Sequence, residues 1–326
     1  MSPDILTAIA ADPAMDFLRP ALLPESVAPV LARAVGREVE VAAIRGVRHK
    51  HGRRCVIDYD LRSGTESTRT LVAKVRVKGV DRRTFTLVRT LRESGFHEDA
   101  PDGIHIPEPL EIVPEFRMLL TAKASGVPAG ELLHNSEDGD LARRIAAIAW
   151  KLHSAGVPSQ RTHTVKDELS ILGDRFAKVG AAHPELSDRL AKIFERCECI
   201  ASRLPPVSAT GIHRDFYPAQ VLVDGLRSWL LDLDLYCIGD PAIDVGNFIG
   251  HMTEHSLRTA GGSDAFRKAE IALQEEYVRL SGGATSGEAI QTYKLLTVAR
   301  HIYVSTLFPE RKAATSLLLE YCEREM

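Results

Sequence analysis

The sequence predicts an α+β fold with two lobes, a mixed α/β N-terminal lobe over residues 1–120 and a mainly helical C-terminal lobe over residues 121–326. The first lobe is predicted because Arg54–Leu61 and Thr70–Val77 alternate apolar and polar residues, as half-buried strands do. The second is predicted because apolar residues recur at helical spacing after the boundary. A chain of 326 residues is also long for one core and suits two domains.

The two predicted strands of the first lobe form a hairpin, because the polar, glycine-containing stretch Arg62–Thr68 joins them. Upstream of this hairpin, Gly46–Arg53 is a basic segment with two glycines. It is interpreted either as a loop that covers a phosphate or as a basic surface turn. At the end of the lobe, the apolar run Arg117–Gly126 passes into small residues, which is typical of a hinge or of an ordinary strand end.

Helices dominate the predicted second lobe. The apolar residues from Leu141 to Leu152 repeat at helical spacing, Asp140 is placed to cap the start of this helix, and Gly156 marks its stop. Further amphipathic helices are predicted over Asp167–Val179, Pro184–Arg203, Asp264–Leu280, Glu288–Leu307 and Pro309–Glu325.

A short hairpin is predicted in the middle of this helical lobe. Val221–Val223 and Ser228–Leu233 are apolar, strand-like runs, and Asp224-Gly225 between them is a strong turn signal. The two strands therefore run antiparallel.

The register of this hairpin decides which side chains meet at its open end. A two-residue turn sets Gln220 opposite Trp229, and a four-residue turn sets it opposite Leu231. Either register leaves Asp232 at the same end as Gln220 and as the loop that holds Asp215.

Asp215, Gln220 and Asp232 thus bring three oxygen-bearing side chains to one place. Mg²⁺ is a hard cation that takes oxygen ligands and is commonly held by one or two carboxylates together with substrate phosphates. Gln220 and Asp232 suit the metal, and Asp215 suits the base that accepts the proton of an attacking hydroxyl. This arrangement indicates phosphoryl transfer. For His213-x-Asp215 alone, a hairpin flanked by surface acids would be the better interpretation.

Several motifs follow one another in register between Ile212 and Asn247. They are His213-x-Asp215 through Gln220, then Asp232-x-Asp234, then Gly239-Asp240-Pro241-Ala242-x-Asp244. In this order and spacing they resemble the active-site segment of the aminoglycoside phosphotransferase and choline kinase-like superfamily, whose members are small-molecule relatives of protein kinases. The resemblance implies a bilobal protein kinase-like fold with ATP and Mg²⁺ as cofactors.

Carried over position by position, the resemblance also implies roles for single residues. Asp215 is the catalytic base, Asp232 the principal Mg²⁺ ligand, His213 a residue that organises the loop, and Asp244 a structural carboxylate. Asp234, two residues past Asp232 and expected on the same strand face, either assists the metal, touches the acceptor or is purely structural.

The resemblance extends to the first lobe. Val72-Ala73-Lys74 matches the start of the kinase V-A-x-K pattern, whose lysine pairs with the ATP phosphates, so Lys74 is the candidate for that role. The alternative is that Lys74 lies on the solvated face of an amphipathic strand. Arg117–Gly126 resembles the connector between lobes, where backbone groups hydrogen-bond the adenine edge, and this implies nucleotide contacts at Met118 and Ala122.

Two positions depart from the family pattern. Gln220 replaces an Asn and offers the same carbonyl oxygen one methylene further out, so either the loop retracts locally or a second metal position is weakened. Kinases also pair the phosphate lysine with a helix glutamate. Here Asp81 is a better candidate for that partner than Glu93.

Composition excludes several other classes of protein. The formal net charge is −3 and no basic stripe dominates, which argues against nucleic acid as a partner. No apolar run reaches the length of a membrane span, and the first residues lack a secretory leader, so no membrane partner and a cytoplasmic location are expected. Five cysteines form no even disulfide framework and fit reduced thiols.

The predicted reaction is transfer of the ATP γ-phosphoryl group to a hydroxyl of a small molecule, such as an aminoglycoside-, sugar- or amino-alcohol-like acceptor. Two alternatives are a nucleotide-binding regulatory protein that has lost catalysis and a protein kinase. The second is opposed by the lack of an A-P-E element after Asp232. The sequence leaves open the acceptor, a role in antibiotic resistance, the choice between ATP and GTP, and the oligomeric state.

Overall fold

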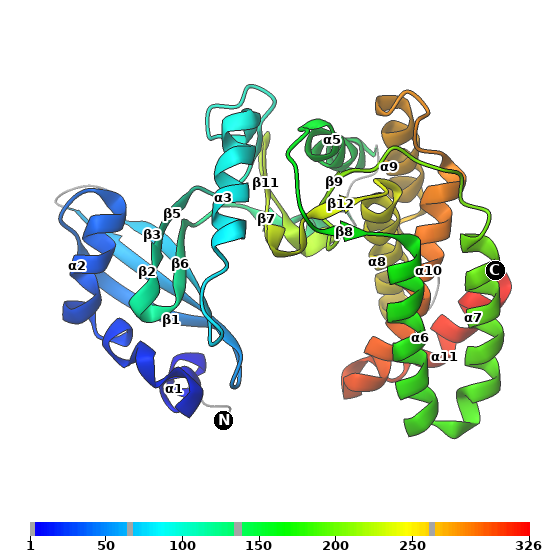
Figure 1. Ribbon diagram of the computed structural model, residues 1–326, viewed down its shortest axis with the longest axis horizontal. Helices are drawn as coiled ribbons and strands as arrows, with labels where there is room; N and C mark the ends of the chain where they lie inside the picture. Colours follow the sequence, from blue (N-terminus) through cyan, green and yellow to red (C-terminus); the bar gives the residue numbers. More distant parts are fainter. Residues whose placement is uncertain (1–3, 64–67, 134–138, 261–264) are drawn as a thin grey trace. The chain divides into compact units, whose positions relative to one another are not determined.

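The computed structural model describes residues 4–63, 68–133, 139–260 and 265–326. It divides into two compact units, Met1–Ser125 and Gly126–Met326 (Figure 1). The sequence placed the boundary after residue 120, which lies inside the strand β6 (Met118–Ala122). The predicted α+β fold class is confirmed, with a sheet-rich first unit and a mainly helical second unit.

The first unit is built on a five-stranded antiparallel sheet in the order β1-β2-β3-β6-β5. Beside β6, its strands are β1 (Glu40–Lys50), β2 (Arg54–Arg62), β3 (Arg69–Arg76) and β5 (Pro109–Val113). The remaining elements are α1 (Ile5–Ala10), a 3₁₀ segment (Pro13–Leu22), α2 (Pro24–Val35), α3 (Arg82–Leu91), a π-type turn (Arg92–Phe96), β4 (Ile104–His105) and a 3₁₀ turn (Pro114–Phe116). The predicted turn over Arg62–Thr68 lies partly outside the described residues.

One face of this sheet packs on the N-terminal helices. Leu71, Ala73 and Val75 of β3 are buried in a core with residues of α1, α2 and the 3₁₀ segment between them. Side chains alternate across a strand, so Lys74 points to the opposite face, where it is only partly buried. The Tyr59 hydroxyl of β2 donates to the Ala21 carbonyl at 3.0 Å and joins sheet and helices.

The turn between β1 and β2 is held by the buried side chain of Asp12. Its Oδ2 accepts hydrogen bonds from the Gly52 amide at 2.7 Å and from His49 Nε2 at 2.9 Å, and its Oδ1 accepts the Ala14 amide at 3.0 Å. Burial raises the pKa of Asp12, but these hydrogen bonds outweigh it and the net pKa lies below its usual 3.8. Most of the segment Gly46–Arg53 belongs to the strand β1 and is not a loop. Asp12 connects its short turn to the N-terminal helices.

We expect Asp12→Ala to lower the free energy of unfolding by about 1–3 kcal/mol, because three hydrogen bonds to a buried carboxylate are lost and their donors are left without this acceptor. Urea unfolding followed by far-UV circular dichroism measures this loss. Asp16→Ala is the matched control. Asp16 and its partner Arg19 are both well exposed, so this change should cost under about 0.5 kcal/mol. Equal losses in the two variants would contradict the role of Asp12.

The second unit contains most of the helices. They are α4 (Ala129–Leu133), α5 (Asp140–Ser154), α6 (Val165–Ala182), α7 (Ser187–Ala201), α8 (Ala242–Ala260), α9 (Arg267–Leu280), α10 (Gly287–Leu307) and α11 (Ala314–Glu325), with 3₁₀ turns at Pro184–Leu186, Pro218–Gln220, Leu233–Leu235 and Pro309–Arg311. Its short strands are β7 (Val127–Pro128), β8 (Thr162–His163), β9 (Thr210–Ile212), β10 (Val221–Asp224), β11 (Arg227–Leu230) and β12 (Cys237–Gly239). No helix of the described ranges is both long and apolar enough to cross a membrane.

The helices α8 and α10 lie side by side (Figure 1). Thr297 of α10 donates to Asn247 of α8 at 3.3 Å. Glycines allow this approach. A Cβ on Gly246 would lie 2.6 Å from the Cβ of Tyr293, and one on Gly250 would lie 2.7 Å from the Cβ of Thr297. The helix α8, which contains Asp244, is not among the helices predicted from the sequence.

The predicted helices differ from the observed ones mainly at their first residues. The predicted first residue, Asp167, is the third residue of α6, and its side chain forms a capping box with Thr164. Asp140 does not cap α5; it lies inside the helix and binds Arg143 at 2.6 Å. The helix predicted from Asp264 begins at Arg267, and Asp264 itself lies outside the described residues.

Candidate active site

One buried carboxylate holds the loop between β9 and β10 in place. Asp244, at the start of α8, accepts the backbone amide of His213 at 2.6 Å on one oxygen and that of Arg214 at 2.7 Å on the other. Arg214 has a φ of 68°, a left-handed conformation that side chains rarely adopt. Asp244 therefore fixes the two residues that precede Asp215.

A histidine that sequence analysis gave no role supports Asp244. His153 Nε2 donates to Asp244 at 2.9 Å, and the Tyr277 hydroxyl lies 2.5 Å from the other ring nitrogen, Nδ1. Both the His153 and Asp244 side chains are 1 % exposed. In sequence, His153 is one polar residue near the end of an apolar helix face, a pattern that more often marks a satisfied core histidine.

The ring of His213 ties the loop to the segment before Asp232. Its Nε2–H donates to the Leu231 carbonyl at 2.7 Å, and its Nδ1 accepts the Asp215 amide at 3.3 Å. One neutral tautomer satisfies both bonds. His213 thus links the backbone at Asp215 with the backbone next to Asp232, as a loop-organising residue would.

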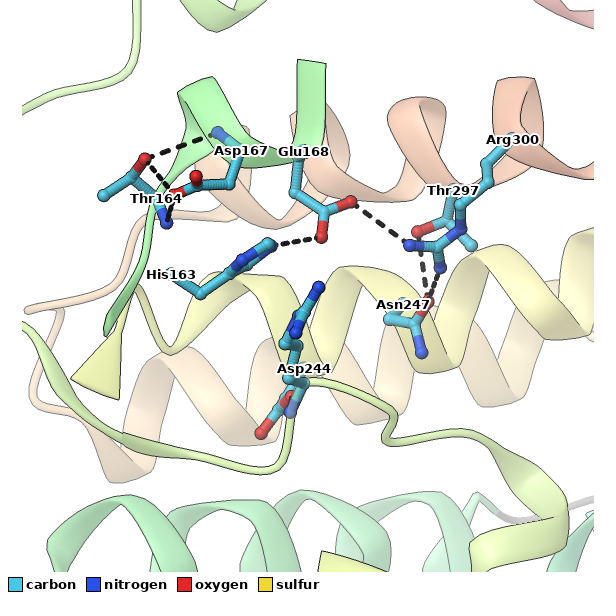
Figure 2. A network of polar contacts seen from close by, with 9 residues as sticks. His163, Thr164, Asp167, Glu168, Asp244, Asn247, Thr297 and Arg300 are labelled. Atoms are coloured by element: carbon cyan, nitrogen blue, oxygen red, sulfur yellow. Dashed lines mark hydrogen bonds and ion pairs between the residues drawn. The ribbon is translucent and has the colours of Figure 1, made fainter. Parts of the chain in front are cut away.

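The far end of the loop is held by Asn247 of α8. Its Nδ2 donates to the Phe216 carbonyl at 2.8 Å, and its Oδ1 accepts from Thr297 at 3.3 Å and from Arg300 (Figure 2). Asn247 is 2 % exposed. An amide in this position satisfies a carbonyl and two donors at once.

Arg300 continues this network to α6. It binds Glu168 at 3.1 Å, whose other oxygen lies 2.6 Å from His163 Nε2 (Figure 2). Beside it, Asp167 accepts the amide and hydroxyl of Thr164 at 2.8 and 2.7 Å. The carboxylates of Asp167 and Glu168 at the start of α6 therefore both have partners.

The carboxyl group of Asp215 is largely removed from water. Burial raises its pKa above the ordinary 3.8, and the charges of Asp232 and Asp244 raise it further, against the opposing charges of His213 and Arg300. A raised pKa suits a group that must accept a proton. Because the charge of Asp232 raises the pKa of Asp215, these two carboxylates interact electrostatically.

The predicted hairpin exists, with its turn at Gly225-Leu226. Val221 pairs with Leu230, and the Leu231 amide donates to the Gln220 carbonyl at 2.8 Å, which is the register predicted for the longer turn. Gln220 is 8 % exposed. The hairpin thus brings Gln220 to the end where Asp232 follows.

Asp232 and Asp234 do not share a strand face, which corrects the expectation. The strand β11 ends at Leu230, Asp232 has a left-handed φ of 56°, and Asp234 lies within the 3₁₀ turn that follows. A strained non-glycine residue of this kind is frequent at functional sites.

The oxygen atoms at the open end of the hairpin suit a hard cation. Asp232 supplies a carboxylate and Gln220 an amide oxygen, the ligand types that Mg²⁺ prefers. The carboxylates of Asp215 and Asp232 raise each other's energy, as the pKa of Asp215 shows, and a bound cation would relieve that repulsion.

The three residues predicted to contact the nucleotide lie in strands of the first unit, Lys74 in β3 and Met118 and Ala122 in β6. Lys74 lies in β3 between Val56 and Leu119. Met118 is wholly buried in the core and pairs with strands on both sides, and the Ala122 amide already donates to the Glu108 carbonyl at 2.9 Å. These contacts do not support the predicted adenine contacts at Met118 and Ala122.

Asp81, the predicted partner of Lys74, caps α3 by accepting the Arg83 amide at 3.0 Å. Glu93 lies in the turn after α3, 3.8 Å from Arg89. Beyond β6, Lys123 binds the buried Asp58 of β2 at 2.5 Å, a pair that sequence analysis did not identify.

The chain combines a sheet-rich unit with a helical unit, and the helical unit contains a carboxylate-braced loop ahead of a short hairpin. These features define a small-molecule kinase of the protein kinase-like fold. The model of the phosphotransferase enzyme family matches residues 67–282, and the chain belongs to this family. The suspected superfamily is thereby confirmed.

Solved structures agree on the fold. A spectinomycin phosphotransferase in complex with ADP and spectinomycin has 14 % identity and a TM-score of 0.60, covering 92 % of this chain and 93 % of its own. A thermostable mutant of an aminoglycoside phosphotransferase has 16 % identity and a TM-score of 0.60, with 92 % and 98 % covered. A choline/ethanolamine kinase family protein from Mesorhizobium loti has 14 % identity and a TM-score of 0.53, with 95 % and 93 % covered. The comparison with curated proteins gave no match.

Proposed function

We propose that this protein transfers the γ-phosphoryl group of ATP to a hydroxyl of a small molecule, with Asp215 as the base. The observation that carries the proposal is the braced loop. Asp244 and His213 fix the backbone around Asp215, and the hairpin brings Asp232 and Gln220 to the same region. Similar structures bound to ADP support a nucleotide as donor.

The proposal assigns roles to single residues. Asp215 orients the acceptor hydroxyl and takes its proton, while Asp232 and Gln220 hold Mg²⁺ through oxygen atoms. The ion, when bound, neutralises charge on the phosphate oxygens. Lys74 positions the phosphates, and Asp234 either assists the metal or touches the acceptor. We expect the protein to act in the cytoplasm.

The test is ADP release by the purified protein with Mg-ATP and a panel of hydroxylated metabolites and antibiotics. Release that depends on both an acceptor and Mg²⁺ is the expected result. A thermal shift with Mg-ATP but no acceptor-dependent release would instead favour the regulatory alternative. Repeating the assay with GTP determines the donor.

A second experiment tests whether Gln220 is a metal ligand. We expect Gln220→Asn to keep activity, because the amide oxygen remains, and Gln220→Leu to raise the Mg²⁺ concentration needed for half-maximal rate about tenfold or more, the effect of roughly 1.4 kcal/mol. The two variants separate chemistry from packing, since Leu matches the bulk of this buried side chain. A Leu variant with the parental Mg²⁺ dependence would show that Gln220 only packs.

A further inference from the structure

Two histidines near the turn between β1 and β2 lie beside the buried carboxylate of Asp12. Asp12 Oδ2 is 2.9 Å from His49 Nε2 and 3.4 Å from His51 Nδ1. The three ligand atoms all lie within 4.8 Å of one another. Across the described ranges, this is the one group of three or more histidine, cysteine, aspartate or glutamate side chains close enough together to hold a metal ion.

The charge of Asp12 has no lysine or arginine partner in the part of the chain that the structure describes; its ion pairs there are with the two histidines. The side chain is 0 % exposed. Burial raises its pKa, but hydrogen bonds from Gly52, His49 and Ala14 bring the pKa below the usual 3.8, so the carboxyl group is ionised at neutral pH. Buried charges in proteins are paired or coordinate metals.

The strand β1 directs its basic side chains away from this cluster. Arg48 and Lys50 flank His49 and are exposed, and side chains alternate across a strand, so both point to the face opposite His49. His49 pairs with Cys55 of β2, which is buried in the core with the N-terminal helices. The cluster therefore lies on the helix-covered face of the sheet, away from these two positive charges.

The ligand types and spacing suit a transition metal. Two imidazole nitrogens with one carboxylate oxygen are typical ligands of Zn²⁺, whereas Mg²⁺ prefers oxygen alone. Bonds of about 2.0–2.1 Å in a tetrahedral Zn²⁺ site separate the ligand atoms by about 3.3–3.4 Å. The distances from Asp12 Oδ2 to His49 and His51, 2.9 and 3.4 Å, are close to this value. The amides of Ala14 and Gly52 orient the carboxylate, as outer partners of metal ligands do.

We propose that Asp12, His49 and His51 bind one divalent transition-metal ion of the Zn²⁺ type. The ion takes the place of the proton between Asp12 and His49, whose side chain is 12 % exposed, and His51, whose side chain is 77 % exposed, completes the site from the solvent side. Water fills the remaining position. Asp12 precedes the 3₁₀ segment Pro13–Leu22, so the ion ties the β1–β2 turn to the N-terminal helices.

The first test is calorimetric titration of the full chain with Zn²⁺. The protein is purified without a polyhistidine tag, stripped of metal with EDTA and kept in excess Mg²⁺, which occupies sites made of oxygen ligands such as the one proposed at Asp232. We expect one Zn²⁺ to bind per chain. A parent protein that binds no Zn²⁺ under these conditions would overturn the proposal.

Two variants locate the ion. His51→Ala removes an exposed ligand, and His49→Gln keeps a donor for Asp12 but removes the imidazole. Each should weaken Zn²⁺ binding at least about tenfold, because loss of an outer partner alone costs 10–100-fold in metal affinity. His97→Ala changes an exposed histidine of the same unit and should bind like the parent. Parental affinity in either His51→Ala or His49→Gln would refute the three-residue site.

Hydrogen exchange provides a readout that depends on neither calorimetry nor kinase activity. An ion that binds only the folded site suppresses its local opening. Zn²⁺ should therefore slow amide exchange in peptides that cover residues 49–54 of the parent and of His97→Ala, and leave the same peptides of His51→Ala unchanged. Equal slowing in His51→Ala, or no slowing in the parent at saturating Zn²⁺, would show that the ion does not bind at this turn.

Discussion

Replacing Asp215 by Asn is expected to lower turnover by about 10²–10⁴, the usual contribution of a positioned general base. Asn has nearly the same shape, and the Asp215 amide can still donate to His213, so the loop should keep its conformation. The amide oxygen of Asn cannot take a proton from the acceptor. Steady-state rates with saturating Mg-ATP measure the loss, and ATP affinity should stay within a few-fold.

The matched control for Asp215 is Asp188→Asn, which changes an exposed acid of α7 and should leave turnover unchanged. The pH profile adds an independent readout. Burial raises the pKa of Asp215, and the base must be deprotonated, so kcat/KM should fall as the pH drops through a value above 3.8. If Asp215→Asn turns over at the parental rate with the same acid limb, another group is the base.

The second large effect is expected at Asp244. Asp244→Asn should lower the free energy of unfolding of the second unit by about 3–5 kcal/mol, because one carboxylate oxygen that accepts a buried donor becomes an NH₂ group. His213, Arg214 and His153 all donate to Asp244. Both tryptophans of the chain, Trp150 and Trp229, lie in this unit, so urea unfolding followed by tryptophan fluorescence reports on it directly.

Asp240, four residues earlier in the same motif, provides the control for Asp244. It accepts the Ala242 amide at 2.9 Å, and Asn supplies the same acceptor oxygen. Asp240→Asn should therefore cost under about 1 kcal/mol. Equal destabilisation by the two substitutions would show that Asp244 has no special part in holding the loop.

The residues of the hairpin show what could be predicted from sequence. The convergence of Gln220 and Asp232 depends on strand pairing over a dozen residues, and the observed register is one of the two that the turn allowed. The left-handed backbone at Asp232 could not be predicted in this way, because no glycine or turn dipeptide marks it. The expectation that Asp234 shares its strand face failed for that reason.

Met118 shows a second limit. Sequence similarity to a connector between lobes suggested a nucleotide contact, but the strand β6 lies between β3 and β5, and this central position buries Met118. Strand order in a sheet depends on pairings between distant segments. A hydrophobic run does not reveal whether it will be central or at an edge.

By itself the sequence determined the fold class, the family and the local order of Asp215, Gln220 and Asp232, because these depend on periodicity and short spacing. Only the tertiary structure decided what holds that site in place. His153 and Asp244 are 91 residues apart, and Glu168 and Arg300 are 132 apart. Such pairs form because α5, α6, α8 and α10 pack together, and burial of their apolar faces, which is not directional, sets which polar groups then meet.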